Sequence, residues 1–393
     1  NAYTAGLRQQ TGAFGPGSWP SNVPNSALKW ESVETYNAAL DATLFNRKLE
    51  LTVDVYRKIT TDMLLPSSLP AFTGIGTNWD DIQSPITNAG KIQNTGVDIS
   101  ATSYNIQRSA FSWRTSFNVT HYKNVLKELN AGTSAIPYSA TDALNADRVV
   151  TRTVIGHPVG QFYGYIADGL YQSEEDIDNS AKNPLITKGP KGIWVGDVKY
   201  RDISGPDGNP DGKIDSYDVT VIGNPNPKFT FGLTNNFTFK NFDFSFFLQG
   251  SYGADILNFT RLLTEGSYNA YHNQSVDVFN NRYSPSNPTG TLPRYNQWHG
   301  DNLALSSRFV EDGSYLRIQN VTLGYNLPKS LISKAKISSA RVFVLGQNLY
   351  TFTKYTGLDP ELGSYNNNAL MSNVDNGNYP NPRTFTVGAN ITF

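Results

Sequence analysis

Regular alternation of apolar and polar residues is the feature that most constrains what this chain can fold into. One clear stretch places large apolar residues at alternate positions among threonine, glycine and asparagine: Phe229, Phe231, Leu233, Phe237 and Phe239. A period of two puts successive side chains on opposite faces of a β-strand. Such stretches run for about ten residues, which is the length that a tilted strand needs to cross a bilayer core. The pattern therefore predicts strands with one apolar and one polar face.

Eleven stretches of this kind predict eleven antiparallel strands, at about 33–45, 48–60, 91–104, 110–122, 148–156, 159–168, 228–239, 242–252, 314–327, 340–352 and 383–393. The connections alternate in length, and the long ones are 61–90, 123–147, 169–227, 253–313 and 353–382. Long loops at one end and short turns at the other are typical of outer-membrane barrels. We therefore predict an all-β fold. It is an antiparallel transmembrane β-barrel over 33–393 with extracellular long loops, preceded by an extracellular loop segment over 1–32.

The number of predicted strands is odd, whereas single-chain bacterial barrels have an even number. An open sheet in lipid would leave its edge groups unpaired, at several kcal/mol each. The chain begins with Asn1 rather than with a signal sequence, and a turn-rich stretch with Pro16, Pro20 and Pro24 follows. We therefore expect the partner strands to lie upstream and to be absent from this chain.

Composition excludes several functional classes. The 32 basic and 33 acidic residues give a net charge of −1, which offers no basis for binding nucleic acid. The chain has no cysteine, so disulfide scaffolds and thiolate metal sites are excluded. Neither a nucleophile elbow nor a phosphate-binding glycine loop occurs. No catalytic residue is assigned, and we expect that the chain is not an enzyme.

One stretch has the spacing of a calcium-binding loop. Oxygen ligands fall at positions 1, 3, 5 and 9 of a twelve-residue EF-hand-type register, and Gly212 at position 6 permits the sharp turn. Position 12 is Asp218, which has a shorter side chain than the usual Glu. We therefore predict a structural Ca²⁺ site made by Asp207, Asn209, Asp211, the Lys213 carbonyl, Asp215 and Asp218. The alternative is a solvated turn rich in aspartate and glycine.

Several segments, taken together and in order, resemble one family. They are 27–31 (ALKWE), 199–202 (KYRD), 211–215 (DGKID), 221–229 (VIGNPNPKF), 315–328 (YLRIQNVTLGYNLP), 346–350 (GQNLY) and 355–361 (YTGLDPE). The ordered set resembles the C-terminal half of the SusC/RagA-like TonB-dependent transporters of the Bacteroidetes outer membrane. The resemblance extends from about Leu28 to Phe393.

This resemblance implies about eleven strands of a 22-stranded barrel, without the N-terminal plug, embedded in outer-membrane lipid. It also implies a SusD-like surface lipoprotein as a lid, and energy supplied by TonB through the missing N-terminal part. The implied substrates are oligosaccharides or peptides, and no substrate-binding residues are assigned. The terminal Phe393 resembles the signal that the outer-membrane assembly machinery reads.

Two other interpretations remain open from the sequence. A secreted, calcium-stabilised β-sandwich that binds carbohydrate would show the same alternation, but it would bury Phe229, Phe242 and Phe244 in a core. A membrane barrel would instead gather aromatic rings at two levels about 25 Å apart. A barrel used for adhesion or scaffolding, without transport, is the third interpretation.

Overall fold

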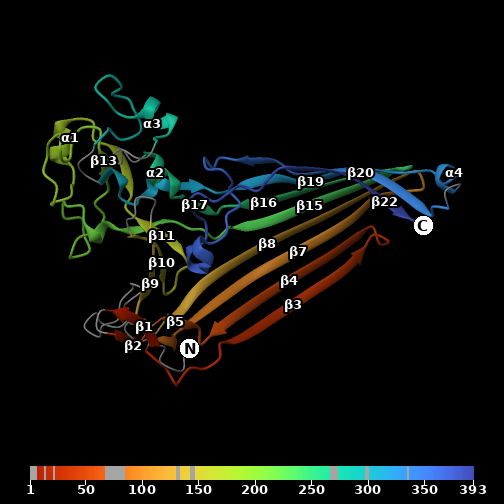
Figure 1. Cartoon of the computed structure of the whole chain (residues 1–393), viewed down its shortest axis with the longest axis horizontal. Helices are drawn as coiled ribbons and strands as arrows, with labels where there is room; N and C mark the ends of the chain where they lie inside the picture. The colour runs from red at the N-terminus through yellow and green to blue at the C-terminus, as the bar shows by residue number, and fades with distance from the viewer. Residues whose placement is uncertain are drawn as a thin grey trace.

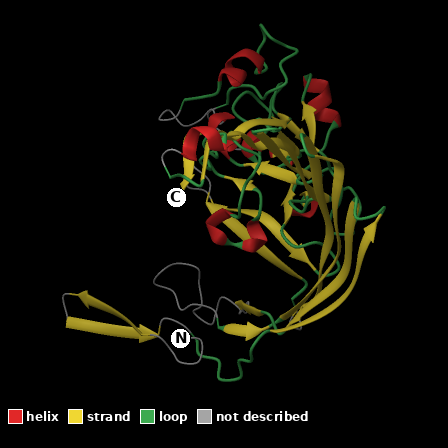
Figure 2. Ribbon diagram, turned by 90° about the vertical axis from the view of Figure 1, so that its right-hand side faces the viewer, coloured by secondary structure: helices red, strands yellow, loops and turns green. Residues whose placement is uncertain are grey.

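The computed structural model describes residues 7–12, 15–20, 23–66, 85–129, 133–141, 147–265, 273–296, 301–333 and 336–393. Its main feature is a curved antiparallel sheet of nine strands, which we name the wall. The wall forms the long flank of the molecule in Figure 1 and an open arc in Figure 2. From edge to edge its strands are β22 (Thr384–Thr392), β20 (Ser339–Thr353), β19 (Tyr315–Asn326), β16 (Phe242–Tyr252), β15 (Phe229–Phe239), β8 (Phe111–Leu129), β7 (Gly90–Arg108), β4 (Leu49–Thr61) and β3 (Ser32–Leu44).

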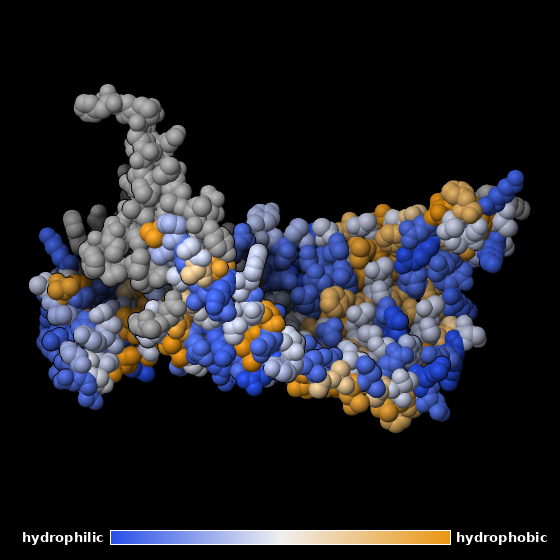
Figure 3. Space-filling model, turned by 90° about the horizontal axis from the view of Figure 1, so that it is seen from below, coloured by the Kyte–Doolittle hydropathy of each residue, from blue (hydrophilic) through white to orange (hydrophobic). Residues whose placement is uncertain are grey.

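Alternate residues of the wall form two chemically different faces. Leu233 of β15 lies opposite Phe117 of β8 on one side and Leu248 of β16 on the other. Three residues further along β15, Asn236 lies opposite Arg114. Because paired residues point to the same side of a sheet, the strands share one apolar face and one polar face. In Figure 3, hydrophobic residues gather along the lower margin of the strand-rich half, beside a largely hydrophilic surface.

Large apolar side chains lie on the outside of the wall rather than in a core. Phe229, Phe242 and Phe244 are 36, 48 and 38% exposed. A water-soluble sandwich would bury these three rings, whereas a barrel presents them to hydrocarbon. The arrangement agrees with the membrane-barrel prediction and removes the support for the secreted sandwich.

Aromatic rings on the apolar face gather near both ends of the strands. Near the long-connection end, Phe229 lies 5.1 Å from Tyr252, measured between ring centroids. Near the short-turn end, Phe242 lies 4.7 Å from Tyr325. The 11 residues of β15 span about 33 Å along the strand, or about 23 Å across the membrane at a tilt near 45°. The two groups therefore have the spacing expected for the two aromatic girdles of a barrel.

Two of the eleven predicted strands do not belong to the wall. The predicted strands 148–156 and 159–168 correspond to β10 (Asp147–Val154) and β11 (Gln161–Gly164), which lie in a separate four-stranded sheet. There Val150 and Phe162 are fully buried against protein. Alternation of apolar and polar residues predicts a strand with one apolar face. It does not show whether that face packs against protein or against lipid. The wall of the described residues therefore has nine strands rather than eleven.

The bounds of two predicted loops also differ from those in the structure. The predicted loops 123–147 and 169–227 belong to a single connection, 130–228, because β8 continues to Leu129 and the chain next joins the wall at β15. The segment 1–32 was predicted as a loop, and it contains a hairpin of β1 (Leu7–Gly12) and β2 (Gly15–Pro20). Its many glycine and proline residues indicated turns and concealed these short strands.

The remaining elements are short and lie in the connections. The strands are β5 (Leu64–Pro66), β6 (Ile86–Asn88), β9 (Ala135–Thr141), β12 (Ala167–Leu170), β13 (Val198–Tyr200), β14 (Thr220–Gly223), β17 (Asp255–Asn258), β18 (Val310–Asp312) and β21 (Val374–Asp375). The α-helices are α1 (Glu174–Asn179), α2 (Thr260–Glu265), α3 (Val276–Asn281) and α4 (Lys329–Ile332), and the 3₁₀-helices are η2 (Ser216–Asp218), η3 (Asp301–Leu303), η4 (Ser307–Phe309), η6 (Tyr365–Asn367) and η7 (Ala369–Met371). Among the described residues, every helix is too short or too polar to cross a bilayer.

The connections are sorted by length between the two ends of the wall. Short turns lie at the right-hand end in Figure 1, beside α4 and the C-terminus. Lys240 forms one of these turns with a positive φ of 52°. At the opposite end lie the three longest connections, 130–228, 253–314 and 354–383, which we name the loop cap.

A single hydrophobic core joins the three connections of the loop cap. The connection 130–228 contributes Ala140, Val150 and Phe162. The other two contribute Leu257, Phe259, Leu262, Leu303, Leu305, Phe309, Met371 and Val374. Each connection therefore buries apolar surface against the other two, and the loop cap has a folded interior of its own.

Candidate functional site

Four sets of charged residues, most of them buried or partly buried, hold the loop cap together and fix it to the wall. Burying charge is costly unless each charge is paired and hydrogen-bonded. The partners of these residues therefore indicate whether each set has a structural role or could bind a ligand. The four sets are centred on Asp197, Arg261, Arg317 and Asp255.

Asp197 joins two of the long connections. Its carboxylate accepts two bonds from Arg294, Nε to Oδ1 at 2.8 Å and Nη2 to Oδ2 at 2.9 Å. It also accepts a bond from the Asn302 amide at 2.8 Å and one from the Trp194 backbone N–H at 2.8 Å. The Asp197 side chain is 2% exposed. It is therefore a fully bonded buried anion, and we name these contacts the Asp197 clasp.

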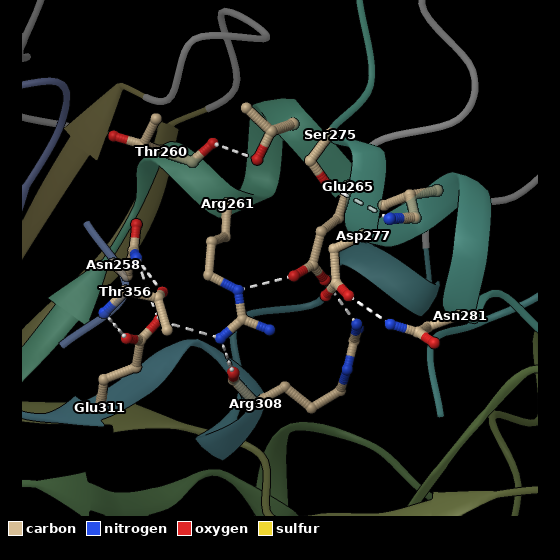
Figure 4. Close-up of polar contacts among 12 residues, drawn as sticks. Asn258, Thr260, Arg261, Glu265, Ser275, Asp277, Asn281, Arg308, Glu311 and Thr356 are labelled. Atoms are coloured by element: carbon tan, nitrogen blue, oxygen red, sulfur yellow. Dashed lines mark hydrogen bonds and ion pairs between the residues drawn. The ribbon is translucent and has the colours of Figure 1, made fainter. Parts of the chain in front are cut away.

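A second set surrounds α2, where two arginines and two glutamates alternate (Figure 4). Arg261 lies between Glu265, at 2.6 Å, and Glu311, at 3.1 Å. Arg308 reaches the other oxygen of Glu265 at 2.6 Å. Burial acts to lower the pKa of Arg261, but the two glutamates outweigh it and the pKa rises. The four charges cancel, so this set is suited to a structural role.

A cavity of about 640 Å³ adjoins this second set. Arg261 and Glu265 line it, and so do Asp277 and Thr356 (Figure 4). Glu311 accepts bonds from the Asn258 amide and the Thr356 backbone N–H, at 3.0 and 2.8 Å. The polar groups at this cavity are therefore largely satisfied by the protein itself.

The third set fixes the connection 354–383 to the polar face of the wall. Arg317 of β19 is 2% exposed as a side chain and pairs with Asp359 and Glu361 of that connection. Its Nε also donates to the Thr351 hydroxyl of β20 at 3.0 Å. Because Arg317 points to the polar face, the connection is held over the inside of the curved sheet.

The fourth set contains two acidic side chains in neighbouring strands. Asp255 of β17 lies opposite Asp312 of β18. Burial raises the pKa of Asp255, and the nearby Asp312 adds to the effect. A bond from the Asn224 backbone N–H at 2.8 Å acts in the opposite direction. This carboxyl group is therefore harder to ionise than an exposed one.

The predicted calcium loop lies in the connection 130–228, before β14. Asp218 is buried, and its carboxylate accepts bonds from the backbone N–H groups of Ile203, Ser204 and Asp215. Asp215 itself caps η2, accepting from the Tyr217 N–H at 2.8 Å. Asp218 therefore anchors backbone, a role that the sequence did not indicate.

The other predicted ligands, Asp207, Asn209, Asp211 and Lys213, lie at the surface. Asp202, which is not one of the predicted ligands, accepts a bond from the Gly212 N–H at 2.6 Å, and its other oxygen is buried without a hydrogen-bond partner. Among the residues that the structure describes, no group of three or more His, Asp or Glu side chains is arranged to hold a metal ion. Calcium binding stays a prediction.

The terminal Phe393 follows β22 and is 85% exposed. It continues the apolar row of that strand by one residue. Its role as an assembly signal stays a prediction.

Comparison with known proteins agrees with this architecture. The family model described as "TonB dependent receptor-like, beta-barrel" matches residues 1–349. The chain belongs to this family. Its fold also matches the solved structure of the RagAB peptide transporter, with a TM-score of 0.79 at 24% identity over 100% of this chain and 39% of that one. The likeness at this identity concerns the fold alone.

Curated TonB-dependent receptors match nearly the whole chain. TonB-dependent receptor P3 of Formosa agariphila is 38% identical over 95% of this chain and 35% of its own length. TonB-dependent receptor SusC of Bacteroides thetaiotaomicron is 30% identical over 94% of this chain and 32% of its own. The chain thus spans about a third of the length of these relatives. As part of a TonB-dependent receptor barrel, it belongs in the bacterial outer membrane.

Proposed function

We propose that this chain forms the C-terminal barrel part of an importer that carries oligosaccharides or peptides across the outer membrane, driven through TonB. The observation that carries the proposal is the sorting of side chains on the wall. Leu233 and its paired neighbours face lipid, while Asn236 and Arg114 face the inside of the curve. A polar lumen within an apolar shell is what passage of a hydrophilic solute requires.

The loop cap supports a role in import rather than in adhesion alone. Arg317 holds the connection 354–383 over the polar face of the wall, and the Asp197 clasp ties 130–228 to 253–314. Loops fixed over the inside of a barrel control entry to it, whereas adhesive loops need only project outward.

We also propose that a SusD-like surface lipoprotein covers the loop cap. The relative named SusC and the solved RagAB transporter support this partnership by similarity. The outermost part of the loop cap also exposes apolar side chains suited to contact with protein, including Leu185, Val276 and Phe279, which are 91, 75 and 76% exposed.

Uptake by the native bacterium tests the proposal. Deletion of the gene for the full-length receptor should abolish entry of one labelled class, oligosaccharides or peptides, and the intact gene should restore it. A protonophore should block entry in the restored strain, because TonB draws on the proton gradient. Unchanged uptake after deletion would contradict import, and surface binding without entry would favour the scaffold interpretation. Purification of the receptor should also yield a lipoprotein that mass spectrometry identifies as SusD-like.

A further inference from the structure

Arg152 of β10 differs from most of the arginines in the interior of the described part of this protein. The buried Arg317 and four partly buried arginines pair with carboxylates, the four being Arg261, Arg294, Arg308 and Arg341. Arg152 is also partly buried, but within the described part of the chain it forms no ion pair. Its Nη1 donates instead to the Tyr163 hydroxyl of β11 at 2.6 Å. A partly buried guanidinium without a carboxylate partner is able to pair with an anion from outside.

Arg152 lines a cavity of about 560 Å³ in the loop cap. Among the described residues that line it, Arg148 and Arg152 are charged and none is Asp or Glu. Arg148 has a contact of its own, so the argument depends on Arg152. Tyr163, Tyr165, Val149 and apolar or small residues make up most of the remainder. This volume falls in the usual range for ligand pockets, about 300–1,000 Å³. The cavity is therefore large enough for part of an oligomer, and the Arg152 side chain belongs to its lining.

The walls of the cavity are held by fixed backbone contacts. The Tyr165 N–H donates to the Leu305 carbonyl at 2.9 Å, and the Ser307 N–H donates to the Tyr165 carbonyl at 2.9 Å. At Gly164, an added Cβ would lie 2.5 Å from the Leu305 oxygen, so only glycine permits this close approach. The connections 130–228 and 253–314 therefore form the cavity together and keep it open.

The orientation of Arg152 suits recognition of a carboxylate. Its guanidinium carbon lies 4.9 Å from the centre of the Tyr163 ring, and this cation–π contact helps to hold the guanidinium beside the ring. The Tyr163 hydroxyl accepts the Arg152 bond, so its own proton remains available for a ligand oxygen. Arg152 keeps N–H groups beyond the one that Tyr163 uses. A planar fork with a neighbouring hydroxyl is a common arrangement for holding a carboxylate.

We propose that this cavity binds the carboxylate of an incoming oligomer, with Arg152 pairing to it and Tyr163 donating a hydrogen bond. This inference rests on the proposed importer function and specifies its substrate class. Two sources supply the same chemistry: a uronic-acid unit of an oligosaccharide, or the free C-terminus of a peptide. The proposal is that the negative charge itself is recognised.

Calorimetric titration of the purified full-length receptor tests this with two matched ligand pairs. One pair is an oligouronide and its methyl ester, and the other is a short peptide and its C-terminal amide. We expect at least a tenfold preference for the charged member of one pair, which identifies the source. R152Q should abolish that preference and leave binding of the neutral member unchanged. Y163F should reduce the preference in part, and R152K should do the same because it keeps charge without the fork.

Arg114 provides a matched control, because it is an exposed arginine on the polar face of the wall. R114Q should keep the full preference. Equal binding of charged and neutral ligands, a preference that survives in R152Q, or no binding of either pair would each overturn the proposal. Uptake assays with R152Q separate this result from the importer function, because import of a neutral oligomer by R152Q would show that transport is intact. Resistance of the folded barrel to SDS without heating would show that R152Q is folded.

Discussion

The guanidinium of Arg294 forks onto the carboxylate of Asp197, with both nitrogen–oxygen distances below 3 Å, at 2.8 and 2.9 Å. The two residues are 97 positions apart in the chain and belong to different long connections. Their side chains are only 13 and 2% exposed. This pair therefore joins the connections 130–228 and 253–314 directly to each other, and neither residue belongs to the wall.

Removal of the Asp197 carboxylate should open the loop cap. We expect Asp197→Ala to lower the free energy of local opening by about 3–5 kcal/mol, because it removes the carboxylate that pairs with the largely buried Arg294 and leaves it only backbone carbonyls as partners. Hydrogen exchange of the backbone around 192–197 and 292–302 in the full-length receptor measures this. Asp168→Ala is the control, since Asp168 and Arg201 form a pair that is 46 and 52% exposed, worth at most about 1 kcal/mol. Equal effects of the two substitutions would contradict the clasp.

The two faces of the wall should respond differently to the same charge. Leu233 and Thr234 are neighbours near the middle of β15, but they point to opposite faces. Leu233→Arg places a charge in hydrocarbon and should lower the free energy of unfolding by about 2–4 kcal/mol. Thr234→Arg should change it much less, because Thr234 lies on the face of the sheet that carries the polar residues. Urea unfolding of the full-length barrel from vesicles measures both. A larger loss for Thr234→Arg would reverse the assignment of the faces.

Calcium binding by the loop 207–218 can be tested by titration. If the prediction holds, the full-length receptor releases or takes up heat with Ca²⁺, and Asp211→Asn weakens the binding several-fold because one anionic ligand is lost. Chelation should increase proteolytic cleavage within 169–227 and leave the barrel folded. Asp168→Asn, in the same connection but outside the loop, is the control. A flat titration of the folded receptor would eliminate the site.

Asp255 should make the loop cap less stable as the pH rises. Burial, aided by Asp312, raises its pKa in the folded state, so the folded protein holds this proton more tightly than the unfolded chain. Stability then falls as the pH rises from the unfolded pKa, about 3.9, through the raised folded pKa. Asp255→Asn should remove this slope and raise the melting temperature at pH 7. Melting curves of the full-length receptor between pH 4 and 8 measure it.

The pKa of Asp176 is shifted in the opposite direction to that of Asp255. Burial acts to raise its pKa, but the Gln172 backbone N–H, Lys199 and Ser180 outweigh burial and lower it. Its contribution is therefore present above the unfolded pKa and is lost as the pH falls through the lowered folded one. Asp176→Asn should lower the melting temperature at pH 7. The same direction of change for both substitutions would contradict the assignment of these two environments.

The sequence predicted the wall well because its signal is local. The strand expected at 228–239 is observed at Phe229–Phe239, and the one expected at 242–252 at Phe242–Tyr252. The same alternation assigned β10 and β11 to the wall incorrectly, since a strand that packs on protein shows the period of one that packs on lipid.

The charged groups of the loop cap were not predicted, for a related reason. Asp197 and Arg294 lie far apart in polar segments, and neither segment has a spacing that indicates its partner. Arg317 lies within a predicted strand, where a single charged residue indicates only that its side chain faces the lumen. Only the path of the connection 354–383 brings Asp359 and Glu361 to it.

The hydrophobic core shared by the three connections of the loop cap limits which surface loops can be exchanged between related receptors. Phe162, Leu257 and Val374 come from three separate connections and touch the same core. A chimera that takes a single surface loop from a related receptor would insert side chains shaped for other neighbours, leaving voids or clashes. A change of binding preference, in evolution or in the laboratory, should therefore require that all three connections be exchanged together.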